Sequence, residues 1–173
     1  MKTLVVTVLA ILSFGIITAQ ETPVVLEDVV VSSKNQKFLN AVQDDYTPDV
    51  AREMEALAAR YELNQPHTPY YLTHLDNITE TDYVVEFFST KGYMYALYDE
   101  NGDISVCSER YKDISLPKPV RDQVYNENEG WQIDKNQYKS VFKNDKLIKK
   151  EYKMHLSNGN DSRVVVVDVH NRN

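Results

Sequence analysis

The chain of 173 residues contains a single cysteine, Cys107. One cysteine cannot form a disulfide within the chain, so burial of apolar side chains has to hold the fold together. We expect Cys107 to pack as a small apolar residue in a strand, although a disulfide between chains or a reactive thiol is also open to it.

Glycine is scarce as well, with five residues in the chain. The Gly-x-Gly-x-x-Gly fingerprint, the Walker phosphate loop and the Gly-x-Ser-x-Gly elbow are absent from the sequence, which argues against the common dinucleotide, nucleotide and serine-hydrolase sites. After the first 20 residues the glycines are Gly92, Gly102, Gly130 and Gly159. Each lies beside a run of strand-forming or helix-forming residues, so we expect turns or helix ends there.

Metal-binding and catalytic patterns are also missing. The sequence has no His-x-x-x-His or Cys-x-x-Cys spacing, and its neighbouring carboxylates fall in predicted turns and helix ends. We therefore predict no metal, no cofactor and no enzymatic activity. His67 and His74 do share the segment 67–82 with three carboxylates, so a small-ligand or metal-binding periplasmic protein is the alternative.

One long uncharged apolar run is present, and it lies at the start of the chain. Residues 4–17 follow Lys2 and precede Thr18-Ala19-Gln20, which is the layout of a secretory signal peptide. The run is shorter than the roughly 20 residues that a membrane-spanning helix needs. We expect residues 1–19 to be removed after Ala19, leaving a periplasmic or secreted protein without a transmembrane anchor.

Basic residues are outnumbered, with 19 Lys and Arg against 26 Asp and Glu and a formal net charge of −7. This balance argues against nucleic acid as a partner. We expect another envelope or secreted protein instead, because the predicted outer face of the sheet carries aromatic side chains. The exception is a lysine-rich segment comprising Lys135, Lys139, Lys143, Lys146, Lys149, Lys150 and Lys153. It indicates either a solvated sheet face that protects an edge or a surface that steers an acidic partner.

A leader segment, 20–46, precedes the first predicted helix, which starts at Thr47-Pro48-Asp49 with a capping hydroxyl, a proline and an acid. Apolar residues then recur at helical spacing until about residue 63, and Pro66 prevents continuation. The residues predicted to form the buried stripe are Val50, Met54, Leu57, Ala58 and Tyr61.

The rest of the chain alternates strand and turn patterns. We predict strands at 70–75, 83–89, 93–98 and 104–111, a second helix at 116–130, and strands at 131–138, 146–156 and 163–170. The fold class is therefore α+β, with two helix-plus-antiparallel-sheet units in tandem, at 47–113 and 114–173. The two units either stay separate or share one continuous sheet.

Side-chain alternation gives the predicted sheet two apolar faces. A three-residue turn at 90–92 would pair Phe87 with Tyr95 and place both under the helix. The opposite face would then carry aromatic and methionine side chains, the residue types that supply most binding energy at exposed patches. The predicted binding residues are Phe88, Met94, Tyr98 and Tyr111. They form either an outer binding surface or a contact buried between the two units.

Packing and turn residues over 47–170 follow a recognisable pattern. Its stretches are Tyr83-Val84-Val85-Glu86-Phe87 with 93–102, Ile114-Ser115-Leu116-Pro117 with Val120 and Gly130-Trp131, and 152–156 with Gly159. The pattern resembles the PepSY-like, β-lactamase-inhibitor-protein-like (BLIP-like) domains of exported bacterial proteins. The resemblance implies a helix laid on a small antiparallel sheet, used twice, in a protein that binds other proteins or restrains an enzyme. The long link 64–82 departs from this pattern, and the family has no shared catalytic residues.

Overall fold

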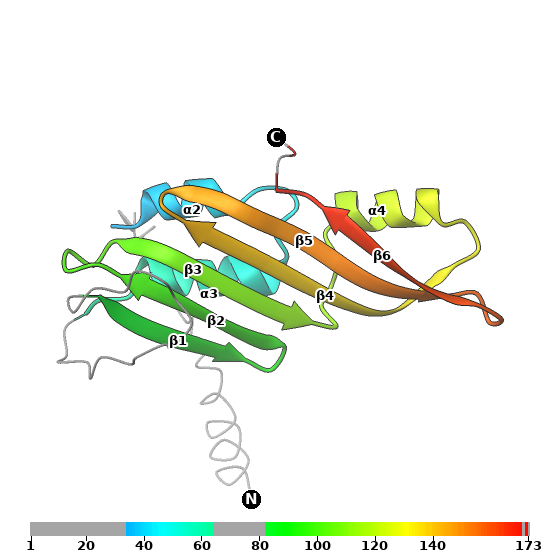
Figure 1. Cartoon of the computed structure of the whole chain (residues 1–173), viewed down its shortest axis with the longest axis horizontal. Coiled ribbons are helices and arrows are strands. Elements are labelled where there is room, and N and C mark those ends of the chain that lie inside the picture. Colours follow the sequence, from blue (N-terminus) through cyan, green and yellow to red (C-terminus); the bar gives the residue numbers. More distant parts are fainter. Residues whose placement is uncertain (1–33, 64–81, 171, 173) are drawn as a thin grey trace, which may run out of the picture. The chain divides into compact units, whose positions relative to one another are not determined.

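The computed structural model describes residues 34–63, 82–170 and 172, all of which fall in one compact unit (Figure 1). The helices are α2 (Gln36–Val42), α3 (Asp49–Ala59) and α4 (Lys118–Glu127). The strands are β1 (Tyr83–Ser89), β2 (Gly92–Tyr98), β3 (Ile104–Lys112), β4 (Gln132–Lys143), β5 (Lys146–Ser157) and β6 (Ser162–Asp168). This confirms the predicted α+β class. In the described ranges no helix combines the length and the apolar character that crossing a membrane requires.

The six strands form one sheet in the order β1-β2-β3-β4-β5-β6, and every neighbouring pair is antiparallel. The helices pack on one face of this sheet, here called the inner face (Figure 1). The other face, called the outer face, carries no helix of the described chain. The predicted strand at 70–75 and the predicted signal peptide at 1–19 lie outside the described residues.

Helix α3 begins where its sequence predicts, at Asp49, but ends at Ala59 rather than near residue 63. Thr47 does not cap it: its hydroxyl donates to the carbonyl oxygen of Val42 at 3.0 Å. The helix is also rotated relative to the predicted stripe, since Leu57 is 39% exposed and Glu55 is fully buried. The prediction was wrong there because periodicity alone could not anticipate a buried glutamate.

The first hairpin has a different register from the predicted one. Ser89 pairs with Gly92, so the turn has two residues, and Phe87 lies opposite Met94 instead of Tyr95. Gly92 is the first residue of β2, and only glycine fits there because a Cβ would collide with the carbonyl oxygen of Arg110. A one-residue shift in register exchanges the two faces of a strand. Met94 and Tyr98 therefore belong to the inner face, together with Phe87.

Large aromatic side chains fill the inner face. Tyr111, Tyr138 and Tyr152 are register partners on β3, β4 and β5, with ring centroids 6.3 Å and 5.0 Å apart. All three are fully buried, as is Cys107 at 3% exposure, which confirms its predicted packing. Aromatic contacts across neighbouring strands stabilise a sheet by fractions of a kcal/mol to about 1 kcal/mol each.

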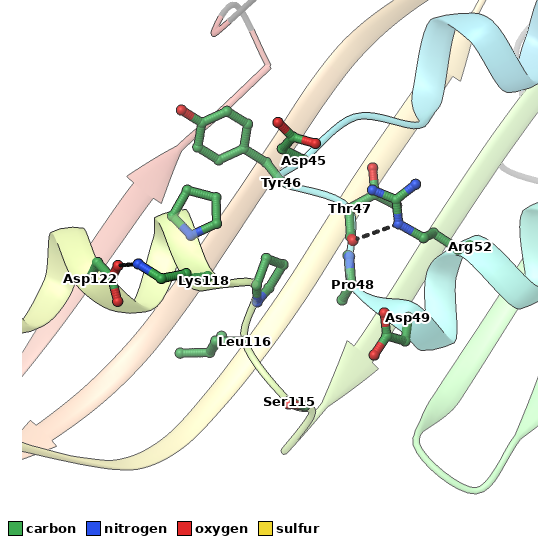
Figure 2. Close-up of a pocket in the computed structure, with 12 residues that line it drawn as sticks. Asp45, Tyr46, Thr47, Pro48, Asp49, Arg52, Ser115, Leu116, Lys118 and Asp122 are labelled. Atoms are coloured by element: carbon green, nitrogen blue, oxygen red, sulfur yellow. Dashed lines mark hydrogen bonds and ion pairs between the residues drawn. The ribbon is translucent and has the colours of Figure 1, made fainter.

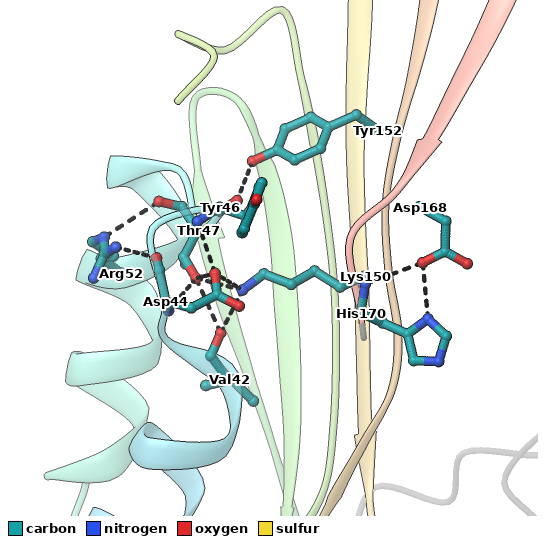
Figure 3. A network of polar contacts seen from close by, with 9 residues as sticks. All are labelled: Val42, Asp44, Tyr46, Thr47, Arg52, Lys150, Tyr152, Asp168 and His170. Carbon is teal, nitrogen blue, oxygen red and sulfur yellow. Dashed lines mark hydrogen bonds and ion pairs between the residues drawn. The ribbon is translucent and has the colours of Figure 1, made fainter. Parts of the chain in front are cut away.

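A buried lysine fastens the α2–α3 link to the sheet (Figure 3). Lys150 on β5 is fully buried, and its ammonium donates to Val42 O at 2.8 Å, Thr47 Oγ1 at 2.6 Å and Asp44 Oδ1 at 2.6 Å. The Tyr152 hydroxyl donates to the same link, at Tyr46 O, 2.7 Å away. Lys150 thus has a structural role, unlike the other lysines of its strand.

Candidate binding face

The outer face of the sheet carries one continuous row of side chains, here called the binding row. Its members are successive register partners on the six strands, Phe88, Tyr93, Arg110, Lys139, Glu151 and Asp168. Residues directly opposite each other on antiparallel strands lie on the same face, with Cβ atoms about 5 Å apart. The row therefore runs from aromatic side chains, through cations, to carboxylates.

The aromatic end of the row is open to solvent. Phe88 is 72% exposed and Tyr93 is 41% exposed. Tyr95, two residues further along β2, stacks on Tyr93 with ring centroids 6.4 Å apart and an interplanar angle of 14°. Exposed apolar side chains are common singly, but a cluster of large, rigid aromatics beside cations is typical of an interaction site.

Only one of the four sequence-predicted binding residues lies on this face. Phe88 is exposed, whereas Met94, Tyr98 and Tyr111 are fully buried on the inner face. Tyr98 donates its hydroxyl hydrogen to Ala58 O of α3 at 2.9 Å. The sequence prediction omitted Tyr93, which a two-residue turn at 90–91 would have placed beside Phe88.

Cations dominate the outer positions of the three central strands. Paired outer positions carry two basic side chains on β3, three on β4 and three on β5, against one acidic side chain, Glu151. The basic ones are Arg110, Lys112, Lys135, Lys139, Lys143, Lys146, Lys149 and Lys153. The whole chain has a net charge of −7, so its positive charge is concentrated on this face. Such an arrangement attracts acidic partners and accelerates their association.

The inner face holds two carboxyl groups instead. Glu55 on α3 and Glu109 on β3 are 0% and 2% exposed. Among the described residues, neither oxygen of Glu55 nor Oε2 of Glu109 has a hydrogen-bond partner. Burial raises the pKa of both carboxyl groups, and the charge of Glu55 raises the pKa of Glu109 further. The side chains of Glu109 and Gln43, followed by the charges of Lys150 and Arg52, oppose the rise in the Glu55 pKa only in part. The pair is therefore protonated more readily than an exposed glutamate.

A cleft of about 620 Å³ lies between the α2–α3 link and the start of α4 (Figure 2). Both cations that line it are engaged by the chain itself. Lys118 pairs with Asp122, and Arg52 donates to the carbonyl oxygens of Thr47 and Asp44. Carboxylates of Asp45, Asp49 and Asp122 line the same cleft, and we assign it no function.

The alternative metal or small-ligand segment at 67–82 lies outside the described residues, apart from Asp82. In the part of the chain that the structure describes, no group of three or more metal-ligating side chains comes together.

Comparison with known proteins yields no relative: no family model, no curated protein and no solved structure matches the chain. The PepSY-like, BLIP-like resemblance therefore stays a prediction based on the residues quoted above.

Proposed function

We propose that the protein is an exported, non-enzymatic binding module of the bacterial envelope that holds an acidic protein partner against the outer face of its sheet. The observation that carries this proposal is the binding row, in which exposed Phe88 and Tyr93 lie beside Arg110 and Lys139. Binding of this kind resembles the protein-binding or inhibitor role that the PepSY-like, BLIP-like pattern implies.

The two halves of the row supply different parts of recognition. Buried aromatic anchors contribute most of the affinity at protein interfaces, and a partner would bury the rings of Phe88 and Tyr93. Cations at the rim chiefly raise the association rate and select acidic surfaces. Both halves are carried by paired strands, so the backbone positions from which the side chains project are fixed before the partner arrives.

Export and tandem organisation complete the proposal. The apolar run at 4–17 followed by Thr18-Ala19-Gln20 supports cleavage after Ala19 and a periplasmic or secreted location. The element order α3-β1-β2-β3 followed by α4-β4-β5-β6 supports two units, 47–113 and 114–173, that share the sheet through the β3–β4 pairing.

The test starts with residues 20–173 as bait in envelope extract of the native organism, followed by calorimetric titration of the purified partner. Phe88→Ser combined with Tyr93→Ser should weaken binding by at least about 30-fold, the loss expected for an interface anchor. Tyr125→Ser is the control, because Tyr125 is an exposed aromatic on α4 whose exposure, 47%, lies between those of Tyr93 and Phe88.

Affinity for the partner should also fall as salt rises, since the cations are solvent-exposed. An unchanged affinity in the Phe88→Ser/Tyr93→Ser protein, or an equal loss in Tyr125→Ser, would show that the partner binds elsewhere and would refute the proposal.

A further inference from the structure

A second feature of the outer face is a small pocket at one end of the β4–β5 hairpin, with a volume of about 220 Å³. Its walls include Lys112 from the end of β3, Lys135 from β4, and Lys153 and His155 from β5. We call it the anion pocket.

The strand register explains why these side chains meet. Lys112 and Lys153 both lie opposite Gln137, one on each side of β4. Lys135 lies opposite His155 in the next pair of outer positions. Neighbouring strands are about 4.8 Å apart, and diagonal neighbours are within reach of long side chains. Three flexible ammonium groups and an imidazole can therefore point at one small volume.

The floor of the pocket is fixed by a backbone clamp. The Asn136 side chain accepts from the Ile114 amide at 3.1 Å and donates to Ile114 O at 2.9 Å. The carboxylate of Asp113, the single acid that lines the pocket, accepts from the Asn136 amide at 3.3 Å. These hydrogen bonds hold the segment after β3 against β4 beside the cations Lys112 and Lys135.

No cation of the pocket forms an ion pair within the described chain, and Asp113 is the one carboxylate that lines the pocket. Lys112, Lys135, Lys153 and His155 take part in no ion pair among those residues, whereas Lys149 on the same strand pairs with Glu151 at 2.9 Å. Like charges at neighbouring cross-strand positions destabilise a sheet. A bound anion would remove this repulsion.

We propose that the anion pocket binds a phosphate group in its doubly charged form. Three ammonium groups and the Asp113 carboxylate leave a formal charge of +2 with neutral histidine, which a dianion balances. The volume is below the roughly 300–1,000 Å³ of whole small-molecule sites, so the pocket suits one phosphate group rather than a large metabolite. Lysine binds phosphate as a point charge, and His155 and Gln137 add directional donors.

This inference goes beyond the proposed function, because the pocket would take its anion whether or not a protein occupies the binding row. The phosphate group could arrive free or as the monoester of a larger molecule, and the same three ammonium groups would recognise either form.

The experiment is a titration of ¹⁵N-labelled protein, residues 20–173, with inorganic phosphate and separately with glycerol 3-phosphate, both at constant ionic strength against chloride. Saturable shifts of the Asn136, Gln137 and Lys153 amide signals are expected. Saturation with inorganic phosphate identifies the free ion as sufficient, and saturation with glycerol 3-phosphate alone identifies a monoester.

Two variants with the same change in charge make the titration decisive. Lys112→Gln combined with Lys153→Gln removes the net charge of the pocket and should weaken binding by about tenfold or more. Lys143→Gln combined with Lys146→Gln changes the far end of the hairpin and should leave it unaltered. Retained signal dispersion in both variants verifies folding.

Three results would overturn the proposal: equal shifts with chloride, no saturation with either phosphate compound, or equal weakening in the two variants. The Phe88→Ser/Tyr93→Ser protein should still bind phosphate, so the binding row and the anion pocket can fail independently.

Discussion

Ionisable side chains are buried on the inner face of the sheet but at least partly exposed on its outer face. Two lysines three residues apart on β5 show the contrast. Lys150 points inward, is fully buried and donates to three oxygen atoms. Lys153 points outward, is exposed and belongs to a cluster without a carboxylate pair among the described residues. Alternation along a strand therefore decides whether a lysine stabilises the fold or remains available to a ligand.

The contrast extends to the acids. The inner face encloses Glu55 and Glu109, while the outer face displays cations. A buried charge needs partners at fixed positions, so changes on the inner face affect the free energy of unfolding. Changes on the outer face should affect binding instead.

The largest expected effect is at Lys150. Lys150→Met keeps most of the aliphatic stem but leaves Val42 O, Thr47 Oγ1 and Asp44 Oδ1 without their shared donor. We expect a loss of about 3–5 kcal/mol in the free energy of unfolding, measured by urea denaturation. Lys153→Met is the matched control and should change it by less than about 0.5 kcal/mol. Equal effects at the two positions would show that burial does not separate them.

Second in size is the comparison of Met94 with Phe88, which sequence reasoning placed on one face. Met94→Ala should lower the free energy of unfolding by about 2–5 kcal/mol, because it opens a cavity beneath the inner face of the sheet. Phe88→Ala should change the free energy of unfolding by less than about 0.5 kcal/mol, because the ring is 72% exposed. Thermal or urea unfolding measures both. Losses of similar size from the two substitutions would contradict the observed register and favour the predicted three-residue turn, which puts both side chains on one face.

The smallest expected effect is the pH dependence set by Glu55 and Glu109. The pKa values of both carboxyl groups are raised in the folded state. Their contribution to the free energy of unfolding is therefore fully present below the usual pKa of glutamate, and it is lost as the pH rises through the raised values. Stability should therefore decline with rising pH, by at most about 1.4 kcal/mol per pH unit for each proton released.

Glu109→Gln should flatten this dependence, as followed by urea denaturation at a series of pH values. The exposed Glu86→Gln variant should leave it unchanged. A stability that rises with pH in the unaltered protein and is insensitive to Glu109→Gln would exclude a protonated pair.

Local signals predicted much of the fold correctly. Thr47-Pro48-Asp49 placed the start of α3, and β-branched and aromatic runs placed β1, β2 and β3 within a residue of their observed ends. Helix α2 was missed because it is seven residues long and has no capping side chain or acidic first turn. Such a short helix depends on packing through Phe38 and Val42 rather than on propensity.

The candidate site was harder to predict, because it depends on register. Gly92 is compatible with a three-residue turn and with the first position of a strand, and in the structure it lies against the Arg110 backbone with no room for a Cβ. That contact joins residues 18 positions apart (110 − 92), which local patterns do not record. The error moved Met94 and Tyr98 to the wrong face and hid the pairing of Phe88 with Tyr93.

The unbroken strand order also has a consequence for how the chain folds. Every strand pairs with its neighbour in sequence, and all pairings except β3–β4, which spans α4, close a short loop. Such local pairings favour fast formation of the hairpins. The longest hairpin, β4–β5, is closed by Asn144 and Asp145 with φ of 52° and 63°, the backbone region that a tight two-residue turn requires. We expect this hairpin to form first and the sheet to grow from it in both directions, with burial of Glu55 and Lys150 among the last events.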